Sequence, residues 1–349
     1  MSEPEIQTSL RLTQFSHGSG CGCKISPAVL DEILKGHAPQ NSFANLLVGT
    51  ESKDDAAILD IGNEECLIST TDFFTPIVDD AFDFGRISAA NAISDVYAMG
   101  GKPILALAIL GFPVEKIPAE VAREIIAGAK AICKEANIPL AGGHSIDSLE
   151  PIFGLSVNGL VKKKNIRRNN AGKAGDLLYM TKSLGTGIIA TAHKRAKVLD
   201  ADLKRAVDVM TQLNSIGSVL SDFEPVHAMT DITGFGLLGH LIEICEGSRL
   251  SAELDYKNIP LLENLEYYTN QFIIPDNAYR NWNAFEKKVS GVSGPSFIPL
   301  CDPQTSGGLL ISVDPSFEEE IKKFGLSFQK PIGRLLESKD FLVSVIGGN

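Results

Sequence analysis

A short motif occurs twice in this chain, and it constrains the fold more than any other feature. Thr71-Asp72 precedes Phe84-Gly85 and a predicted helix in the first half. Thr230-Asp231 precedes Phe235-Gly236 and another predicted helix in the second half. In each copy an aspartate ends a strand near a glycine-marked helix start, and 349 residues are enough for two sizeable cores. The motif therefore predicts two related α/β halves.

Hydrophobic periodicity assigns most of the remaining chain. The predicted strands are 10–15, 56–59, 66–70, 104–110, 152–161, 177–181, 309–313 and 341–346, and the predicted helices are 26–36, 84–99, 118–136 and 202–220. Because 104–110 is continuously apolar, it predicts a strand covered on both faces. The segment 270–296 is polar and predicts loops, and the basic run 162–175 predicts a solvated linker. We expect an N-terminal segment 1–50, a nucleotide-binding domain 51–165 and a second α/β domain 170–349.

The net charge and the cysteine content limit the kinds of function that we expect for this protein. The net charge is -11, from 32 basic and 43 acidic residues, so we do not expect nonspecific electrostatic binding to nucleic acid. The first ten residues lack the pattern of a signal peptide, and the longest apolar run is too short to span a membrane. Six cysteines in so long a chain predict reduced thiols. We therefore expect a cytoplasmic enzyme that does not contact membranes.

Acidic residues recur where strands begin or end. Asp54 and Asp55 begin the first strand of the α/β region, Asp72 ends the next, and Asp231 ends a strand of the second half. Ser88, Asn91 and Asp95 follow at helical spacing and form one polar stripe. Any one of these aspartates alone is explained as a helix cap or turn former. Together they favour a Mg²⁺ site that meets nucleotide phosphates.

The sequence Gly142-Gly143-His144-Ser145 predicts a turn after an apolar strand. Backbone N–H groups in such a turn accept phosphate oxygens, but a plain left-handed turn explains the glycines equally well. His144 is explained by ligand binding or by a structural hydrogen bond.

A glycine-rich loop between Ser16 and Ser26 carries two thiols and a lysine. Gly18, Gly20 and Gly22 alternate with Ser19, Cys21 and Cys23, and Lys24 follows directly. A P-loop is excluded because Cys23 stands where that motif needs glycine before its lysine. A zinc site on Cys21, Cys23 and His17 and a dithiol redox pair both have unusual cysteine spacing. A disordered tail does not explain the concentration of thiols and lysine, so we favour a mobile catalytic loop.

These motifs resemble the selenophosphate synthetase (selenide, water dikinase) family. The resemblance is carried by Gly-Cys-Gly-Cys-Lys at 20–24 and by 54–57, 69–74, 91–101, 141–147, 229–240 and 301–309. Several of these elements also occur in a wider superfamily that includes aminoimidazole ribonucleotide synthetase, thiamine-phosphate kinase and a hydrogenase-maturation protein. The cysteine-lysine loop narrows the resemblance to selenium chemistry.

The resemblance implies a reaction in which ATP, selenide and water give selenophosphate, AMP and phosphate, supplying selenium for selenocysteine and modified tRNA. It implies catalytic roles for Cys21 and Lys24 and Mg²⁺ ligands at Asp55, Asp95 and Asp231. It implies nucleotide contacts at Lys24, Lys53, Asp54, Asp72, Asp95, Gly143, His144 and Ser145. The family also suggests potassium as a second cation, a homodimer with a barrel spanning both copies, and a selenium-delivery partner.

Two other functions stay open at this point. One is a small-molecule kinase of the same superfamily, which would release ADP rather than AMP. The other is a non-catalytic carrier that binds selenium or a soft metal through Cys21 and Cys23. A carrier would leave the aspartates without a role.

Overall fold

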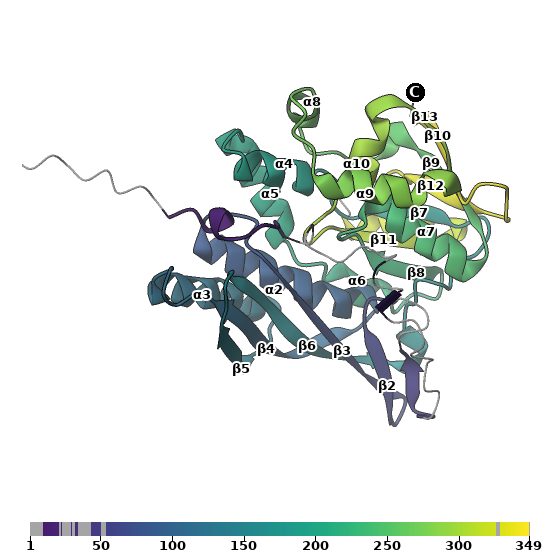
Figure 1. Cartoon of the computed structure of the whole chain (residues 1–349). Helices are drawn as coiled ribbons and strands as arrows, with labels where there is room; N and C mark the ends of the chain where they lie inside the picture. Colours follow the sequence, from purple (N-terminus) through teal and green to yellow (C-terminus); the bar gives the residue numbers. More distant parts are fainter. Residues whose placement is uncertain are drawn as a thin grey trace, which may run out of the picture.

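The residues that the structure describes form two β-sheets, each built from one part of the chain (Figure 1). The computed structural model describes residues 10–20, 22, 29, 32–33, 43–49, 54–325 and 329–348. The predicted helix 26–36 lies almost wholly outside the described residues.

The N-terminal sheet has six strands in the order β1-β2-β3-β6-β4-β5. Its elements are β1 (Leu46–Val48), β2 (Ala57–Gly62), β3 (Glu65–Phe74), α2 (Ala81–Ala98), β4 (Lys102–Phe112), α3 (Ala119–Glu135), β5 (Leu140–Asp147) and β6 (Ile152–Lys162). All neighbouring strands are antiparallel except β4 and β5. The turn expected at Gly62-Asn63 joins β2 to β3, with positive φ at both residues. The strands and helices predicted between residues 56 and 161 are confirmed, several of them with longer bounds.

The C-terminal sheet has seven strands in the order β10-β13-β9-β12-β7-β11-β8. Its strands are β7 (Leu177–Met180), β8 (Val226–Asp231), β9 (Ser251–Asp255), β10 (Val289–Val292), β11 (Leu309–Val313), β12 (Gly333–Leu336) and β13 (Val343–Gly348). Its helices are α4 (Thr186–Lys194), α5 (Asp200–Thr211), α6 (Ile216–Leu220), α7 (Gly236–Ser248), α8 (Leu265–Thr269), α9 (Asp276–Phe285), α10 (Phe297–Cys301) and α11 (Glu318–Ile321).

The N-terminal sheet buries one face and exposes the other. On β3, Cys66, Ile68 and Phe74 are buried, while Phe73 on the opposite face is 47% exposed. Side chains alternate between the faces of a strand, so the buried face is the one that packs on α2. On β4, Ile104 is 41% and Leu107 38% exposed. The prediction that 104–110 is covered on both faces is therefore wrong for the single chain.

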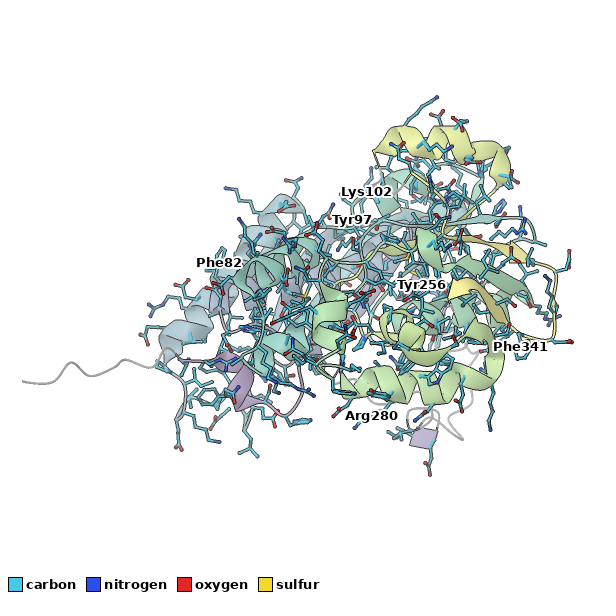
Figure 2. The ribbon with its side chains drawn as sticks, turned by 90° about the horizontal axis from the view of Figure 1, so that it is seen from above. Phe82, Tyr97, Lys102, Tyr256, Arg280 and Phe341 are labelled. Atoms are coloured by element: carbon cyan, nitrogen blue, oxygen red, sulfur yellow. The ribbon has the colours of Figure 1, made fainter. Side chains whose placement is uncertain are left out.

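Helix α2 connects the two halves of the molecule. It is buried along most of its length because it packs on β3, β6 and α3 and also meets α5, α6 and β8 of the C-terminal half. Figure 2 labels Phe82 at the outer edge and Tyr97 near the centre of the molecule, so the helix runs toward the second half. The helix ends at the expected glycines, where Gly100 has φ +80° and packs against Ser221. Its polar stripe therefore faces the junction between the halves.

Several predicted elements differ from the structure. Residues 10–15 contain a 3-10 helix, Leu12–Phe15, because Asp79 accepts hydrogen bonds from the backbone N–H and the hydroxyl of Thr13. The helix 202–220 is broken between α5 and α6, where Lys182 binds the Gln212 carbonyl and the Asn214 amide binds Ser94.

The segment 270–296 is not mainly loop, because it contains α9 and β10. Its buried positions include the polar Asn281, which donates to the carbonyls of Gly234 and Cys301. A polar residue on the buried face conceals the helical period in the sequence.

The predicted linker is partly buried rather than solvated. Arg167 is only 7% exposed and donates to the carbonyls of Ser221 and Phe223 at 2.6 and 3.0 Å. Asn165 donates to Asp222 at 2.6 Å. The basic residues of this segment therefore tie the halves together.

Cys66, Cys133, Cys245 and Cys301 are buried free thiols, as expected for reduced cysteines. Within the described ranges, no helix is both long and apolar enough to cross a membrane.

Candidate active site between the two halves

The polar stripe of α2 and the strand β3 form a hydrogen-bonded network that contains Asp72 and Asp95. The Thr70 hydroxyl donates to Asp95 at 2.5 Å, and the Asn91 amide donates to Asp72 at 2.7 Å. The Asn91 carbonyl oxygen accepts from the backbone N–H of Ser306 at 2.7 Å. Since Ser306 belongs to the C-terminal half, the stripe is fixed from both sides. The fold thus places Asp72 next to the stripe that contains Asp95.

Asp55 lies against the end of β8 in the other half. Its Oδ1 accepts from the Thr230 hydroxyl at 2.9 Å, and its buried Oδ2 has no hydrogen-bond partner among the described residues. Burial raises the pKa of Asp55 well above its ordinary value, and the neighbouring Asp231 and Asp95 raise it further. Asp231 is itself 2% exposed. The fold therefore brings Asp55, Asp95 and Asp231 together, although they are far apart in sequence.

Asp54 and Asp55 make different contacts. Asp54 accepts from the backbone N–H of Asn169 at 2.8 Å, in the segment between the halves. Asp55 instead binds Thr230. This agrees with the expectation that only one of the two adjacent carboxylates joins the distant aspartates.

The carboxylates suit a hard cation. Three buried or nearly buried acidic groups near one another disfavour the charged state, and a divalent ion removes that cost. The unpartnered Oδ2 of Asp55 offers an oxygen ligand of the kind that Mg²⁺ takes. The donor set therefore fits Mg²⁺.

Asp55, Asp95 and Asp231 are not among the described groups whose ligand atoms all lie within 4.8 Å of one another. Of the described side chains, only Asp176, His227 and Asp314 offer three ligand atoms within 4.8 Å of one another. At that second cluster the ammonium of Lys173 lies 2.9 Å from His227 Nε2, so a protein cation is already present. The more open spacing at Asp55 suits ions that keep waters and share phosphate oxygens.

Lys182 is a buried cation near Asp231. Its ammonium donates to the carbonyls of Gln212 and Ser306 at 2.7 and 2.9 Å. Burial lowers the pKa of Lys182 to about 7, and Asp231 acts in the opposite direction. The sequence reasoning missed Lys182 because nothing in its surrounding motif marks it.

Gly143, His144 and Ser145 do not reach the aspartates within one chain. They lie in the exposed edge strand β5, not in the turn that was expected. Asp72 pairs with Leu155, Leu155 with Ala108 and Ala108 with Gly143. Three strand spacings thus separate Gly143 from Asp72, or roughly 14 Å.

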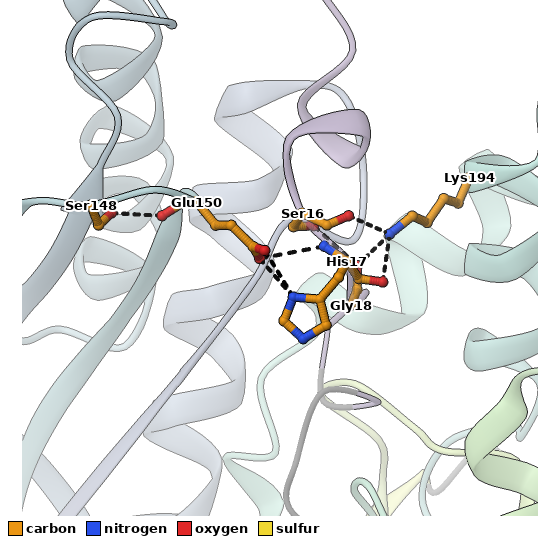
Figure 3. Close-up of polar contacts among 6 residues, drawn as sticks. All are labelled: Ser16, His17, Gly18, Ser148, Glu150 and Lys194. Atoms are coloured by element: carbon orange, nitrogen blue, oxygen red, sulfur yellow. Dashed lines mark hydrogen bonds and ion pairs between the residues drawn. The ribbon is translucent and has the colours of Figure 1, made fainter.

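Both halves hold the segment that precedes Cys21 (Figure 3). Lys194 of α4 donates to the carbonyls of Ser16, His17 and Gly18 at 2.7, 3.1 and 2.7 Å. From the N-terminal half, Glu150 accepts from His17 Nδ1 at 2.9 Å. Neither Lys194 nor Glu150 stands in a motif, so no local pattern marked them as candidates.

The chain is also fixed on each side of Cys21. Gly20 donates to the Thr75 carbonyl at 3.1 Å and has φ +52°. A Cβ there would lie 2.4 Å from Thr305 Oγ1, so only glycine fits. The Asn277 amide donates to the Gly22 carbonyl at 2.5 Å. The predicted site residues Cys21, Lys24 and Lys53, together with Cys23, lie outside the described residues.

Comparisons with known proteins match both halves. The family model "AIR synthase related protein, N-terminal domain" matches residues 53–161. The model "AIR synthase related protein, C-terminal domain" matches residues 173–345.

Curated relatives align over nearly the whole chain. The "Selenide, water dikinase" of Colwellia psychrerythraea is 52% identical over 343 residues, covering 97% of this chain and 99% of the relative. The protein of the same name from Pseudomonas putida is 52% identical over 350 residues, covering 99% and 100%. The one from Pseudomonas aeruginosa is 51% identical over 345 residues, covering 98% and 100%.

Solved structures share the fold at low sequence identity. Thiamine monophosphate kinase from Aquifex aeolicus matches with a TM-score of 0.67 and 16% identity, covering 92% of this chain and 96% of that one. A HypE-HypF complex matches with a TM-score of 0.66 and 18% identity, covering 92% and 97%. These likenesses confirm the predicted two-part α/β architecture.

Proposed function

The chain belongs to the selenide, water dikinase family, and we propose that it makes selenophosphate at the carboxylate site between its two halves. The enzyme is an ATP-dependent transferase that converts ATP, selenide and water to selenophosphate, AMP and phosphate. The observation that carries the location is the meeting of Asp55 with Thr230 and Asp231 across the junction.

In this proposal Asp55, Asp95 and Asp231 hold Mg²⁺, which neutralises charge on the nucleotide phosphates. Asp54 and Asp72 orient the nucleotide from the same junction, and their contacts to Asn169 and Asn91 fix their positions. Phosphoryl transfer needs positioning and charge neutralisation more than covalent help from the protein. A rigid, hydrogen-bonded frame of carboxylates supplies the positioning.

The roles of Cys21, Lys24 and Lys53 rest on the resemblance. Cys21 handles the selenium, and Lys24 and Lys53 contact phosphates. The anchoring of Gly20 and Gly22 supports a fixed place for the chain on both sides of Cys21. The domain bounds 1–50, 51–165 and 170–349 and a cytoplasmic location belong to the same proposal. A potassium requirement and a selenium-delivery partner rest on the resemblance alone.

A homodimer completes the proposal. Gly143–Ser145 lie on an exposed edge strand, roughly 14 Å from Asp72 of the same chain, by three strand spacings. Their resemblance-based contacts to a nucleotide therefore need a second copy of the chain. The exposed apolar face of the N-terminal sheet supports such an assembly.

The test is an anaerobic turnover assay with ATP, Mg²⁺ and selenide, in which products are separated by chromatography and selenophosphate is read by phosphorus NMR. We expect AMP, phosphate and selenophosphate in equal amounts, and no AMP when selenide is omitted. Asp231→Asn should lower kcat at least 100-fold because a ligand charge is lost, on the scale of electrostatic contributions to transition states. Asp340→Asn, at an exposed position, is the matched control.

Two outcomes would contradict the proposal. Stable ADP formed one-to-one with a phosphorylated organic compound would identify a small-molecule kinase of the superfamily. Selenium binding through the thiols without any ATP hydrolysis would identify a carrier.

A further inference from the structure

A cavity of about 300 Å³ lies where the N-terminal segment crosses the C-terminal half. Ser19 and Gly22 line it together with Thr191 of α4 and Asn277 of α9, and the Asn277 amide donates to the Gly22 carbonyl. Ser19 and Gly22 are the described residues nearest to Cys21 that line it. The cavity therefore adjoins the proposed selenium-handling residue in sequence.

The lining of the cavity is cationic. Lys194 lies in α4, Arg195 is the C-cap of α4, and Arg280 lies in α9. Asp276 is the acidic residue among the described lining residues. The Arg195 guanidinium donates to the Phe272 carbonyl at 3.0 Å and that of Arg280 to the Asn277 side chain at 3.3 Å. Each guanidinium has five N–H donors, so both keep donors for a ligand. Among the described residues, neither guanidinium forms an ion pair with a carboxylate, although Asp276 lies on the same helix as Arg280.

Two further features favour a small anion. Ser19 lines the cavity, and its buried Oγ has no hydrogen-bond partner among the described residues. Helix α9 begins at the cavity, and its N-cap, Pro275, makes no side-chain capping bond. The N-terminal end of a helix carries a partial positive charge that attracts anions.

One short loop separates the cavity from the proposed carboxylate site. Thr305 lines the cavity, and the backbone N–H of the next residue, Ser306, donates to Asn91 beside Asp72. An anion in the cavity is thus close to the proposed nucleotide site but is kept apart from its negative carboxylates. This separation matters because two anionic substrates repel each other.

We propose that this cavity recruits the anionic selenium substrate, with Arg195 and Arg280 attracting it toward Cys21. Selenide at neutral pH is the hydrogenselenide anion, a small anion that fits a cavity of about 300 Å³. The inference rests on the proposed function for the identity of the anion. Steering by a cationic site raises the rate of encounter and weakens with salt.

The kinetic test compares the wild type with Arg195→Met/Arg280→Met. At low ionic strength we expect kcat/KM for selenide to fall roughly fivefold, while kcat and the KM for ATP stay unchanged. The difference should vanish at high salt, because screening removes steering in the wild type. Arg195→Lys/Arg280→Lys should restore most of the effect because it keeps both charges. Lys197→Met is the control, since Lys197 is exposed and does not line the cavity.

A binding test separates this inference from the proposed function. Anaerobic calorimetry without ATP uses sodium hydrosulfide as an analogue of the selenium anion, with inorganic phosphate in a parallel titration. Hydrosulfide binding that weakens in Arg195→Met/Arg280→Met supports the cavity even if the wild type makes no AMP. Binding of phosphate but not hydrosulfide would assign the cavity to a product and overturn the inference. Equal salt dependence of kcat/KM in wild type and variant would overturn it as well.

Discussion

Asp55 is a residue whose proposed function lowers the stability of the metal-free protein. Its carboxylate is buried, one oxygen lacks a partner among the described residues, and Asp231 and Asp95 add like charge. Such an arrangement costs folding free energy when no cation is bound. Sites that must bind a cation commonly carry this kind of local instability.

We therefore predict that Asp55→Asn stabilises the metal-free protein while it removes activity. The amide keeps the shape of the side chain and can still accept from Thr230, but it removes one buried charge. In chelated buffer Tm should rise by a few degrees, corresponding to about 1–2 kcal/mol. Mg²⁺-ATP should then raise the Tm of the wild type and not that of the variant. A lower Tm for Asp55→Asn in chelator would contradict this view of the site.

Asp302 gives a prediction about pH. It is fully buried, and burial raises its pKa to about 7, although Gln304 and the backbone of Gly187 donate to it. Because the folded pKa exceeds the ordinary value of 3.8, the unfolded chain releases this proton first as pH rises. The stability from this group is therefore complete below about pH 4 and is lost as pH rises to about 7.

Asp302→Asn should abolish that part of the pH dependence. Between pH 4 and 7 the wild type should lose on the order of 3 kcal/mol relative to the variant. Denaturant unfolding at several pH values measures the difference. Parallel stability profiles for the two proteins would show that Asp302 stays in one protonation state.

Sequence reasoning found the site residues better than their partners. Asp55 begins a strand, Asp95 belongs to the polar stripe and Asp231 ends a strand, so residue type and position made them candidates. The family resemblance then implied that these three are the Mg²⁺ ligands. Thr230 was named only as part of such a motif, and Lys194 not at all. Their contacts join residues that lie 175 or more positions apart, which no local pattern encodes. Position in a fold decides such contacts, not residue type.

At the scale of elements, the packing of α2 on α3 depends on two glycines. A Cβ on Gly85 would lie 1.9 Å from the Ile125 carbonyl oxygen. A Cβ on Gly128 would lie 1.9 Å from the Phe82 carbonyl oxygen. The two helices therefore touch through their backbones, and neither position has room for a methyl group.

We predict that Gly85→Ala destabilises the protein even though alanine favours helix. Helix propensity alone would stabilise by about 1 kcal/mol. Overpacking against a backbone atom costs about 1–3 kcal/mol or more, so the net change should be destabilising. Ala131→Gly on the exposed face of α3 is the comparison, and it should cost about 1 kcal/mol from propensity only. Stabilisation by Gly85→Ala, measured by urea unfolding, would show that the helices separate easily.

Elements with regular apolar spacing were predictable, and those with polar residues on buried faces were not. Helix α3 follows its predicted bounds within a residue at each end. Helix α9 was missed because Asn281 occupies a buried position and is satisfied by two distant carbonyls. The strand β4 was found, but its exposure depends on what covers the sheet and not on its own sequence.

At the scale of the whole molecule, the exposed face of the N-terminal sheet predicts self-association. Leu107 and Phe73 are 38% and 47% exposed there. We expect a dimer in sedimentation velocity, and a shift to monomer for Leu107→Glu because the charge would be buried in the interface. Val219→Glu, at a position 44% exposed on the C-terminal half, should stay dimeric. A monomeric wild type would refute the dimer.

The carboxylates that meet at the junction also affect the cooperativity of thermal unfolding. Asp55 comes from one half and Asp231 from the other, so without a cation their repulsion weakens the junction. A bound divalent ion turns the same contact into a bridge and couples the two folding units thermodynamically. Calorimetry should therefore resolve two partly separate transitions in chelator and one cooperative transition with Mg²⁺-ATP. The ligand would then add to the links made by α2 and Arg167, so that the two halves unfold as a single unit.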